Sequence, residues 1–211
     1  MLPPTIPIFP LPGAVLFPNV FLPLHIFEPR YRTMVSEALE GDRIIGMVLL
    51  RPGWEANYEG RPAIYPIGCA GLITFAEGLS GGRYNIVLRG LEKFRVIDEE
   101  EDARGYRVAT VDSIADSVGD IDQSAMRLAR RRLEALLVPQ PEGRGAEPKV
   151  PPSMPDEDLV NALAQYLELE PVEKQALLER ETLLSRCESL IELLEMKVIV
   201  AQHKWSGEGF N

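Results

Sequence analysis

The chain has 211 residues, of which 45% are hydrophobic, and its formal net charge is -10. This size and composition predict a folded protein with a sizeable core, built as one large domain or two packed subdomains. The negative charge opposes attraction to phosphate backbones and anionic membranes, so we expect neither nucleic acid nor membrane as a partner. No apolar stretch approaches the roughly 20 residues of a membrane-spanning helix, which favours a cytoplasmic location.

Prolines dominate the beginning of the chain. They stand at positions 7, 10, 12, 18, 23 and 29, between aromatic and aliphatic residues. Each proline fixes its own φ, biases the preceding residue toward extended geometry and donates no backbone hydrogen bond. We therefore expect short strands and turns first, and then a helix that begins at Glu28 and Pro29 and ends near Gly41.

The middle of the chain has the pattern of a sheet. Four further strands are predicted at residues 43–50, 64–75, 84–97 and 106–111. Gly78–Gly82 has the composition of a hairpin connection that needs positive φ. The alternation of apolar residues changes phase at Gly90, which predicts a bulge that curls the sheet toward a barrel.

Beyond residue 122 the hydrophobic period changes from two to between three and four, which predicts helices. We expect an amphipathic helix over residues 123–138, shorter helices from about residue 156 and from Pro171, and a long last helix over residues 183–205. The nearest packing partner for the apolar stripe of the last helix is the helix over residues 123–138. Six prolines between residues 139 and 155 predict a mobile, irregular connection.

These elements predict an α+β protein. A curled, partly barrel-like antiparallel sheet with one early helix precedes a bundle of about four helices. We expect a β-rich subdomain at residues 1–118, a helical subdomain at residues 119–205 with its flexible connection at 139–155, and a tail at residues 206–211.

Two segments resemble parts of the N-terminal, substrate-binding domain of Lon proteases: residues 6–32, IPIFPLPGAVLFPNVFLPLHIFEPRYR, and residues 169–179, LEPVEKQALLE. Cereblon carries a related domain. The resemblance spans nearly the whole chain and implies a PUA-like sheet followed by helices. It also implies recognition of proteins or unfolded polypeptides, especially exposed apolar segments, in protein quality control or as an adaptor.

The resemblance further implies a free-standing relative without catalysis of its own. The nucleotide-binding module and the Ser and Lys protease pair of Lon proteases follow this domain. Gly78–Gly82 lacks the Lys and Ser or Thr of a phosphate-binding loop. Cys69 and Cys187 lie too far apart for a metal knuckle, and His203 has no acidic or cysteine neighbours. We therefore predict no enzymatic activity, no cofactor and no metal site.

Two charged clusters have simpler interpretations than ligand sites. Asp98–Asp102 is interpreted as a solvated loop between strands, because consecutive carboxylates point in different directions. The arginines between residues 127 and 132 are interpreted as the solvated face of their helix, paired with nearby carboxylates.

Five aromatic residues are the candidates for peptide binding: Phe17, Phe21, Phe27, Trp54 and Tyr58. The prolines hold several of these segments extended, so the rings could be displayed at low ordering cost. For Phe21 and Phe27 the strand alternation favours core packing instead. Trp54 and Tyr58 are the stronger candidates, because they fall in a predicted surface loop over residues 54–62.

Two other classes of function stay open. The first is a small hydrolase with a pocket between the subdomains, in which His25 acts as a base and Glu28 orients it. The simpler interpretation is that Glu28 caps the first helix and His25 fills a strand position. The second is a structural protein, in which the last helix forms a weak homodimer or an adaptor contact.

Overall fold

The computed structural model describes residues 2–58, 60–101, 105–114, 123–137 and 154–207, with the backbone alone for residues 101 and 201–207. Contacts within the chain form two compact units. The β-rich unit comprises Met1–Ala115 and Asn161–Glu179, and the helical unit comprises Asp116–Val160 and Arg180–Asn211. This grouping differs from the predicted division after residue 118, because residues 161–179 go with the sheet. Whether residues 1–118 and 119–205 behave as separate domains stays a prediction.

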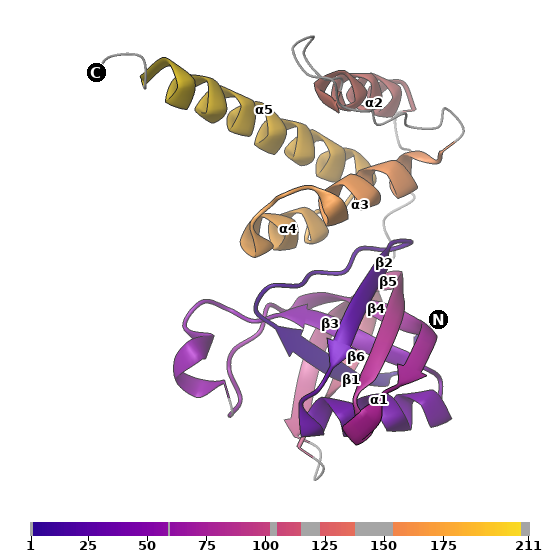
Figure 1. Cartoon of the computed structure of the whole chain (residues 1–211). Coiled ribbons are helices and arrows are strands. Elements are labelled where there is room, and N and C mark those ends of the chain that lie inside the picture. The colour runs from indigo at the N-terminus through magenta and orange to yellow at the C-terminus, as the bar shows by residue number, and fades with distance from the viewer. Residues whose placement is uncertain (1, 59, 102–104, 115–122, 138–153, 208–211) are drawn as a thin grey trace. The chain divides into compact units, whose positions relative to one another are not determined.

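The β-rich unit contains the six strands of the described chain and one early α-helix (Figure 1). Its elements in order are β1 (Thr5–Leu11), β2 (Phe21–Ile26), α1 (Pro29–Glu40), β3 (Ile44–Leu49), the short 3-10 helix η1 (Trp54–Asn57), β4 (Ile67–Gly78), the 3-10 turn η2 (Ser80–Gly82), β5 (Tyr84–Glu101) and β6 (Arg107–Ile114). The predicted α+β class and the hairpin at Gly78–Gly82 are confirmed. The predicted loop over residues 54–62 contains one turn of 3-10 helix.

The sheet closes on itself. Its strand order is β2-β5-β4-β3-β1-β6, and β6 pairs again with β5, so five strands form a ring and β2 lies outside it along β5. The prediction of a wholly antiparallel sheet is wrong for one pair, because β1 and β3 run parallel, with Ile8 opposite Gly46. A parallel pair needs a long crossover connection, and the chain supplies one through β2 and α1.

The predicted acidic loop is also wrong. Residues 98–101 belong to β5 and pair with β6, where Asp98 lies opposite Thr110. The carboxylate of Glu99 accepts a hydrogen bond of 2.9 Å from Nε of the buried Arg107. This cross-strand ion pair explains why an acidic sequence is stable in a strand. Asp102 lies outside the described residues.

Gly90 marks the predicted bulge of β5. Cys69 of β4 lies opposite Lys93, whereas Gly71 lies opposite Gly90, so β5 carries one extra residue at this point. The backbone of Gly90 also accepts a hydrogen bond of 3.0 Å from the N–H of Asn19. A methyl group on Gly90 would lie 2.0 Å from the carbonyl oxygen of Phe17, which only a glycine avoids. The bulge therefore fixes the proline-rich segment before β2 against the sheet.

Helix α3 (Asp156–Tyr166) bonds to the same segment from far along the chain. The side-chain amide of Asn161 donates to the carbonyl of Pro18 at 3.1 Å, and the side-chain oxygen of Gln165 accepts from the N–H of Phe17 at 3.2 Å. The following helix, α4 (Pro171–Leu178), donates from the side chain of Gln175 to the carbonyl of Ile67 at 2.9 Å. These bonds explain why residues 161–179 join the β-rich unit.

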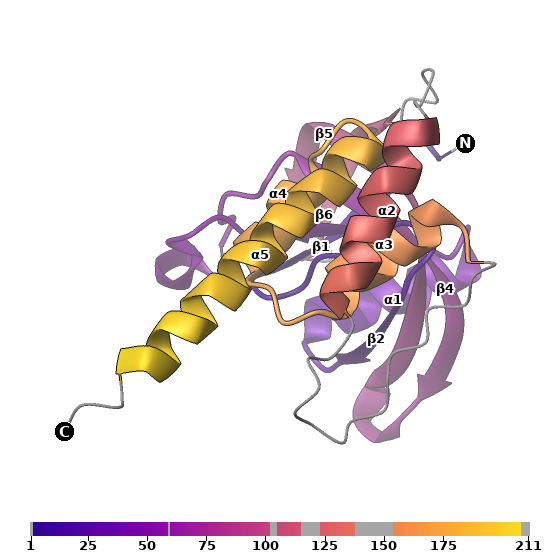
Figure 2. The same ribbon diagram turned by 90° about the horizontal axis from the view of Figure 1, so that it is seen from above.

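In the helical unit, α2 (Gln123–Leu137) packs along α5 (Leu183–Gly207) (Figure 2), as the stripe predicted. Arg132 forms an ion pair with Glu195 at 2.7 Å, and Arg130 forms one with Asp156 at 2.6 Å. The predicted pairing of the arginine cluster with carboxylates is therefore confirmed for these two arginines.

The second half of α5 exposes large apolar side chains: Met196, Val198, Ile199 and Val200. Among the helices of the described residues, none has the length and apolar character to cross a membrane. Most of the predicted connection over residues 139–155 and the last residues of the predicted tail, 208–211, lie outside the described residues.

Candidate binding surfaces

The loop that carries Trp54 and Tyr58 is tied to the body of the β-rich unit. The two rings are half-buried and pack edge to face, with their centroids 5.4 Å apart. The hydroxyl of Tyr58 donates a hydrogen bond of 2.6 Å to Oε1 of Glu28. Burial raises the pKa of Tyr58, and the hydrogen bond to Glu28 raises it further. These contacts hold both rings in place.

Glu28 occupies the N-cap position of α1, as predicted, but its side chain does not cap the helix. Its Oε2 accepts hydrogen bonds from Nε and Nη2 of Arg30, at 3.2 and 3.0 Å. The guanidinium of Arg30 also lies over the ring of Tyr58, 5.0 Å from the centroid. Because the Glu28 carboxylate accepts hydrogen bonds from Arg30 and Tyr58 and not from the backbone N–H groups of α1, the prediction that it caps the helix is wrong. Glu28 instead joins the loop to the start of α1.

His25 lies in β2, as predicted, and belongs to a polar row that crosses three strands. Asn85 of β5 donates from Nδ2 to Oε2 of Glu77 in β4 at 3.1 Å, so its Oδ1 accepts from Nδ1 of His25 at 2.8 Å. Glu28, in contrast, bonds to Arg30 and Tyr58. The base and carboxylate pair of the hydrolase hypothesis is therefore not formed by His25 and Glu28.

Three of the five predicted peptide-binding residues are placed differently from expectation. Phe17 is fully buried, so its ring offers no surface to a peptide. Phe21 is 49% exposed and Phe27 is 60% exposed, so core packing was the wrong interpretation for both. For Phe21 the reason is that β2 lies outside the closed ring, where Phe21, Pro23 and His25 all face outward. Phe27 follows the end of β2, and its ring stacks on that of His25, with the centroids 6.2 Å apart.

Phe75 is an exposed aromatic residue that sequence reasoning missed. Ile73 of β4 lies opposite Leu88, and both are buried, whereas Phe75 lies opposite the next residue, Val87. Thr74 is thus an extra residue in β4, and its hydroxyl donates to the carbonyl of Val87 at 3.1 Å. Strict alternation would turn Phe75 inward, but the bulge turns it outward, and it is 52% exposed.

Four side chains form what we call the aromatic face: Phe21, Pro23, Val87 and Phe75. Pro23, Val87 and Phe75 lie opposite one another across β2, β5 and β4. Phe21 is two residues before Pro23 on the same face of β2. Beside it, Tyr166 of α3 is 64% exposed and donates from its hydroxyl to the carbonyl of Phe21 at 3.0 Å. Two strands and a remote helix therefore bring aromatic rings to one edge of the sheet.

Metal chemistry has no visible basis in the residues that the structure describes. Among them, no group of three or more His, Cys, Asp or Glu side chains is arranged to hold an ion. Cys69 and Cys187 are both buried, as expected for small apolar residues. Burial raises the pKa of the Cys187 thiol to about 11, and Asp156 and Glu188 add to the shift. This thiol is therefore protonated at neutral pH.

The chain matches one family over most of its length. Residues 5–196 match the ATP-dependent protease La (LON) substrate-binding domain. The chain belongs to this family. Lon protease 2 of Myxococcus xanthus is 29% identical to it over 200 residues, which cover 93% of this chain and 24% of that protein. Lon protease of Anaeromyxobacter dehalogenans is 25% identical over 93% of this chain and 24% of its own length.

Solved structures show the same fold of the Lon substrate-binding domain. The Lon N-terminal domain protein from Xanthomonas campestris matches with a TM-score of 0.60 and 22% identity, over 89% of this chain and 97% of that one. The N-terminal domain of the Mycobacterium avium complex Lon protease matches with a TM-score of 0.66 and 15% identity, over 90% of this chain and 98% of that one. At these identities the likeness concerns the fold alone.

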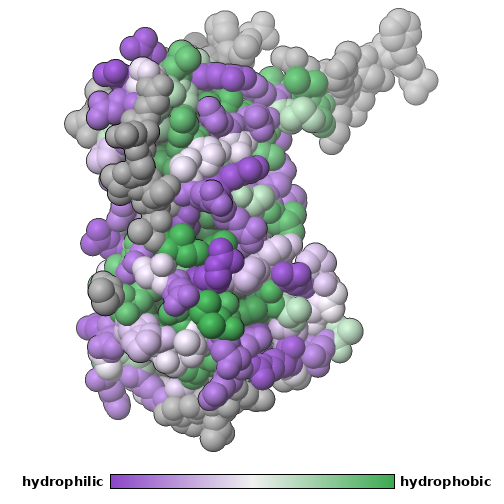
Figure 3. Space-filling view, turned by 180° about the vertical axis from the view of Figure 1, so that it is seen from behind, coloured by the Kyte–Doolittle hydropathy of each residue, from purple (hydrophilic) through white to green (hydrophobic). Residues whose placement is uncertain are grey.

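The β-rich unit exposes apolar residues besides the four of the aromatic face. Seen from behind, apolar residues gather in the middle of the β-rich unit, among polar residues (Figure 3). Ile97, ten residues beyond Val87 on β5, is 54% exposed. Exposed apolar residues outside the aromatic face provide matched controls for binding experiments.

Proposed function

We propose that this chain binds exposed apolar segments of unfolded polypeptides and does not transform them, acting in the cytoplasm as part of protein quality control. The family to which it belongs is described as the substrate-binding domain of an ATP-dependent protease. The aromatic face is the observation that carries the proposal. Exposed aromatic rings on a folded sheet lose little conformational entropy when they bind a partner.

The aromatic face is better suited to binding than the loop with Trp54 and Tyr58. Phe21 and Phe75 are about half exposed, and no hydrogen bond or ring contact ties their side chains to a neighbour among the described residues. Trp54 and Tyr58 already pack on each other. Apolar contacts of an incoming segment would therefore remove more ring surface from water at Phe21 and Phe75.

A titration tests the proposal. The probe is a fluorescein-labelled polypeptide that has been reduced and carboxymethylated so that it cannot fold, and the readout is fluorescence anisotropy. We expect the double variant Phe21→Ala, Phe75→Ala to bind about tenfold more weakly than wild type, because two central aromatic contacts are lost. Ile97→Ala is the matched control, with an equally exposed apolar side chain, and should bind like wild type.

Trp54→Ala forms a separate arm of the same experiment. If Trp54→Ala weakens binding and the double variant does not, the binding surface is the loop rather than the aromatic face. If wild type does not bind the probe at all, or if the double variant and Ile97→Ala lose affinity equally, polypeptide recognition by this face is rejected.

The exposed end of α5 favours a second candidate function, a homodimer or adaptor contact. Met196, Val198, Ile199 and Val200 give this part of the helix an apolar surface among the described residues. Such a contact would bury these side chains. Static light scattering over a wide concentration range tests the homodimer, and one constant monomeric mass would exclude it.

A further inference from the structure

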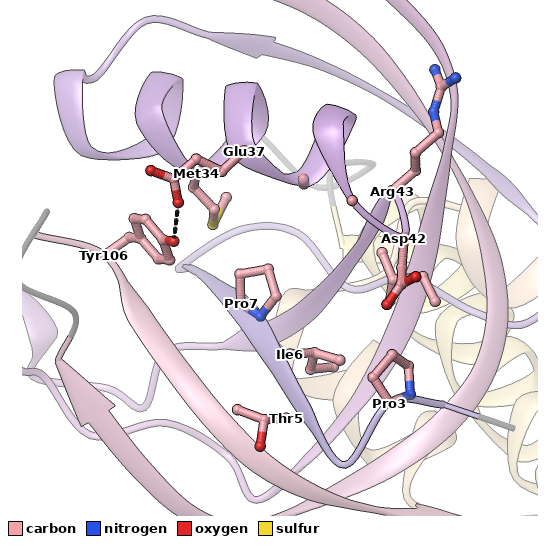
Figure 4. A pocket seen from close by; sticks show the side chains of 12 residues that line it. Pro3, Thr5, Ile6, Pro7, Met34, Glu37, Asp42, Arg43 and Tyr106 are labelled. Atoms are coloured by element: carbon pink, nitrogen blue, oxygen red, sulfur yellow. Dashed lines mark hydrogen bonds between the residues drawn. The ribbon is translucent and has the colours of Figure 1, made fainter.

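A pocket of about 190 Å³ lies in the β-rich unit, beside the C-terminal half of α1 (Figure 4). Pro3, Pro7 of β1 and Ile44 of β3 supply the accessible apolar wall, whereas Ile6 and Met34 line the pocket from the buried core. Sites for drug-sized ligands have volumes of about 300–1,000 Å³. The pocket therefore suits a single side chain better than a whole cofactor.

Two carboxylates stand on the polar side of this pocket. Glu37 of α1 accepts a hydrogen bond of 2.6 Å from the hydroxyl of Tyr106, which lines the pocket and immediately precedes β6. Asp42 follows α1, and its carboxylate turns toward Pro3 at the rim (Figure 4). Arg43 contributes to the lining, but its guanidinium points away from the pocket (Figure 4). The charged side chains that face the cavity are therefore both acidic, and the hydroxyl residues Thr5 and Tyr106 complete its polar lining.

The end of α1 adds to this negative potential. The N–H groups of Gly41 and Arg43 donate to the carbonyl of Ala38, at 3.2 and 2.9 Å, and so close the last turn of the helix. This last turn contains no basic residue. The C-terminal end of a helix carries a partial negative charge that favours cations. The helix end and the two carboxylates therefore all favour a positively charged group in the pocket.

We propose that this pocket takes the side chain of a lysine in a bound polypeptide. The aliphatic stem would pack on Pro3, Pro7 and Ile44, and the ammonium group would lie near Glu37 and Asp42. This inference rests on the proposed function for the statement that the lysine belongs to a polypeptide. It adds a preference for basic residues close to the apolar segments that the aromatic face would bind.

Small probes test the pocket without any polypeptide. N-acetyl-lysine N-methylamide is titrated into the ¹⁵N-labelled full chain, and N-acetyl-norleucine N-methylamide serves as the uncharged counterpart with the same stem. The lysine probe should shift the amide signals of Thr5, Gly41 and Ile44, and should bind about tenfold more tightly than the norleucine probe, because only the ammonium group interacts with the carboxylates.

Charge-neutralising variants assign the effect to the pocket. Asp42→Asn should weaken binding of the lysine probe about threefold, the size of an exposed ion pair. Glu40→Gln is the matched control, because Glu40 also lies in the last turn of α1 but does not line the pocket. It should bind the probe within about twofold of wild type. Glu37→Gln is a second pocket variant, and its folding is checked by circular dichroism because Glu37 is bonded to Tyr106.

The outcomes separate this inference from the proposed function. Equal binding of the two probes, shifts outside the pocket, or equal effects of Asp42→Asn and Glu40→Gln would overturn the lysine pocket, even if unfolded polypeptide binds. If the lysine probe binds here but unfolded polypeptide does not bind the chain, the proposed function fails while the cation pocket stands. A stronger anisotropy signal for a lysine-containing polypeptide than for its norleucine counterpart would support both.

Discussion

Two aromatic regions of the β-rich unit differ in what holds them. The rings of Trp54 and Tyr58 pack on each other, and the hydroxyl of Tyr58 is bonded to Glu28. On the aromatic face, Phe21 and Phe75 project from strands into solvent. The comparison shows that a loop can hold its rings firmly while a sheet displays them. Substitutions in the first region should therefore affect stability, and substitutions in the second should affect binding.

The largest effect on stability is expected at Gly90, which joins the segment before β2 to the sheet. A side chain at Gly90 would collide with the carbonyl of Phe17, a rigid part of the backbone. We expect Gly90→Ala to lower the free energy of unfolding by more than about 3 kcal/mol, measured by urea unfolding. Gly78→Ala is the control, because nothing lies within 4 Å of a methyl group there. A cost at Gly90 no larger than at Gly78 would contradict the close approach.

Trp54→Ala should have the next largest effect. The substitution removes a half-buried ring and its edge-to-face contact with Tyr58. We expect a loss of about 2 kcal/mol in the free energy of unfolding and no change in polypeptide affinity. Urea unfolding and anisotropy on the same preparations measure both. A variant as stable as wild type but weaker in binding would reverse the comparison between the two regions.

Tyr58→Phe removes only the hydroxyl that donates to Glu28, and should cost about 1 kcal/mol near neutral pH. The pKa of Tyr58 is raised in the folded state. An unfolded tyrosine ionises near pH 10, so this contribution is complete below about pH 10 and is lost as the pH rises toward the folded pKa. The stability difference between wild type and Tyr58→Phe should therefore shrink above that pH. A difference that stays constant from neutral to alkaline pH would argue against this role of the hydroxyl.

The smallest effect on stability is expected on the aromatic face itself. The double variant Phe21→Ala, Phe75→Ala should change the free energy of unfolding by less than about 0.5 kcal/mol, since both rings are largely exposed. Thermal unfolding with the Ile97→Ala control is sufficient to detect a larger change. A loss of more than about 1.5 kcal/mol in the free energy of unfolding would mean that the two rings stabilise the sheet and are not simply exposed side chains available for binding.

Local patterns predicted much of the fold. Pro29 at the first turn and Gly41 at the end bound α1, and the glycines between β4 and β5 form the hairpin. These signals act within a few residues, so they can be read from the chain directly. The parallel pairing of β1 with β3 could not be predicted in this way. It depends on where the ring closes, which local propensity does not determine.

The candidate site was harder to predict for the same reason. Phe21 is exposed because β2 lies outside the ring, and Phe75 is exposed because Thr74 is an extra residue. Phe17 is buried because Asn19 and Gln165 hold its segment against Gly90 and α3. Each of these outcomes depends on residues far away in sequence. Residue type alone shows that an aromatic ring is present, but it does not show whether the ring faces the core or the solvent.

The bulge at Thr74 makes the display of Phe75 a matter of strand register. If Thr74 itself paired with Val87, Phe75 would move opposite the buried Ile86 and turn toward the interior. Deletion of Thr74, in contrast, would leave Phe75 opposite Val87 and still facing outward. A slip of one residue along the strand can thus remove a ring from the proposed binding surface without any change in amino-acid composition.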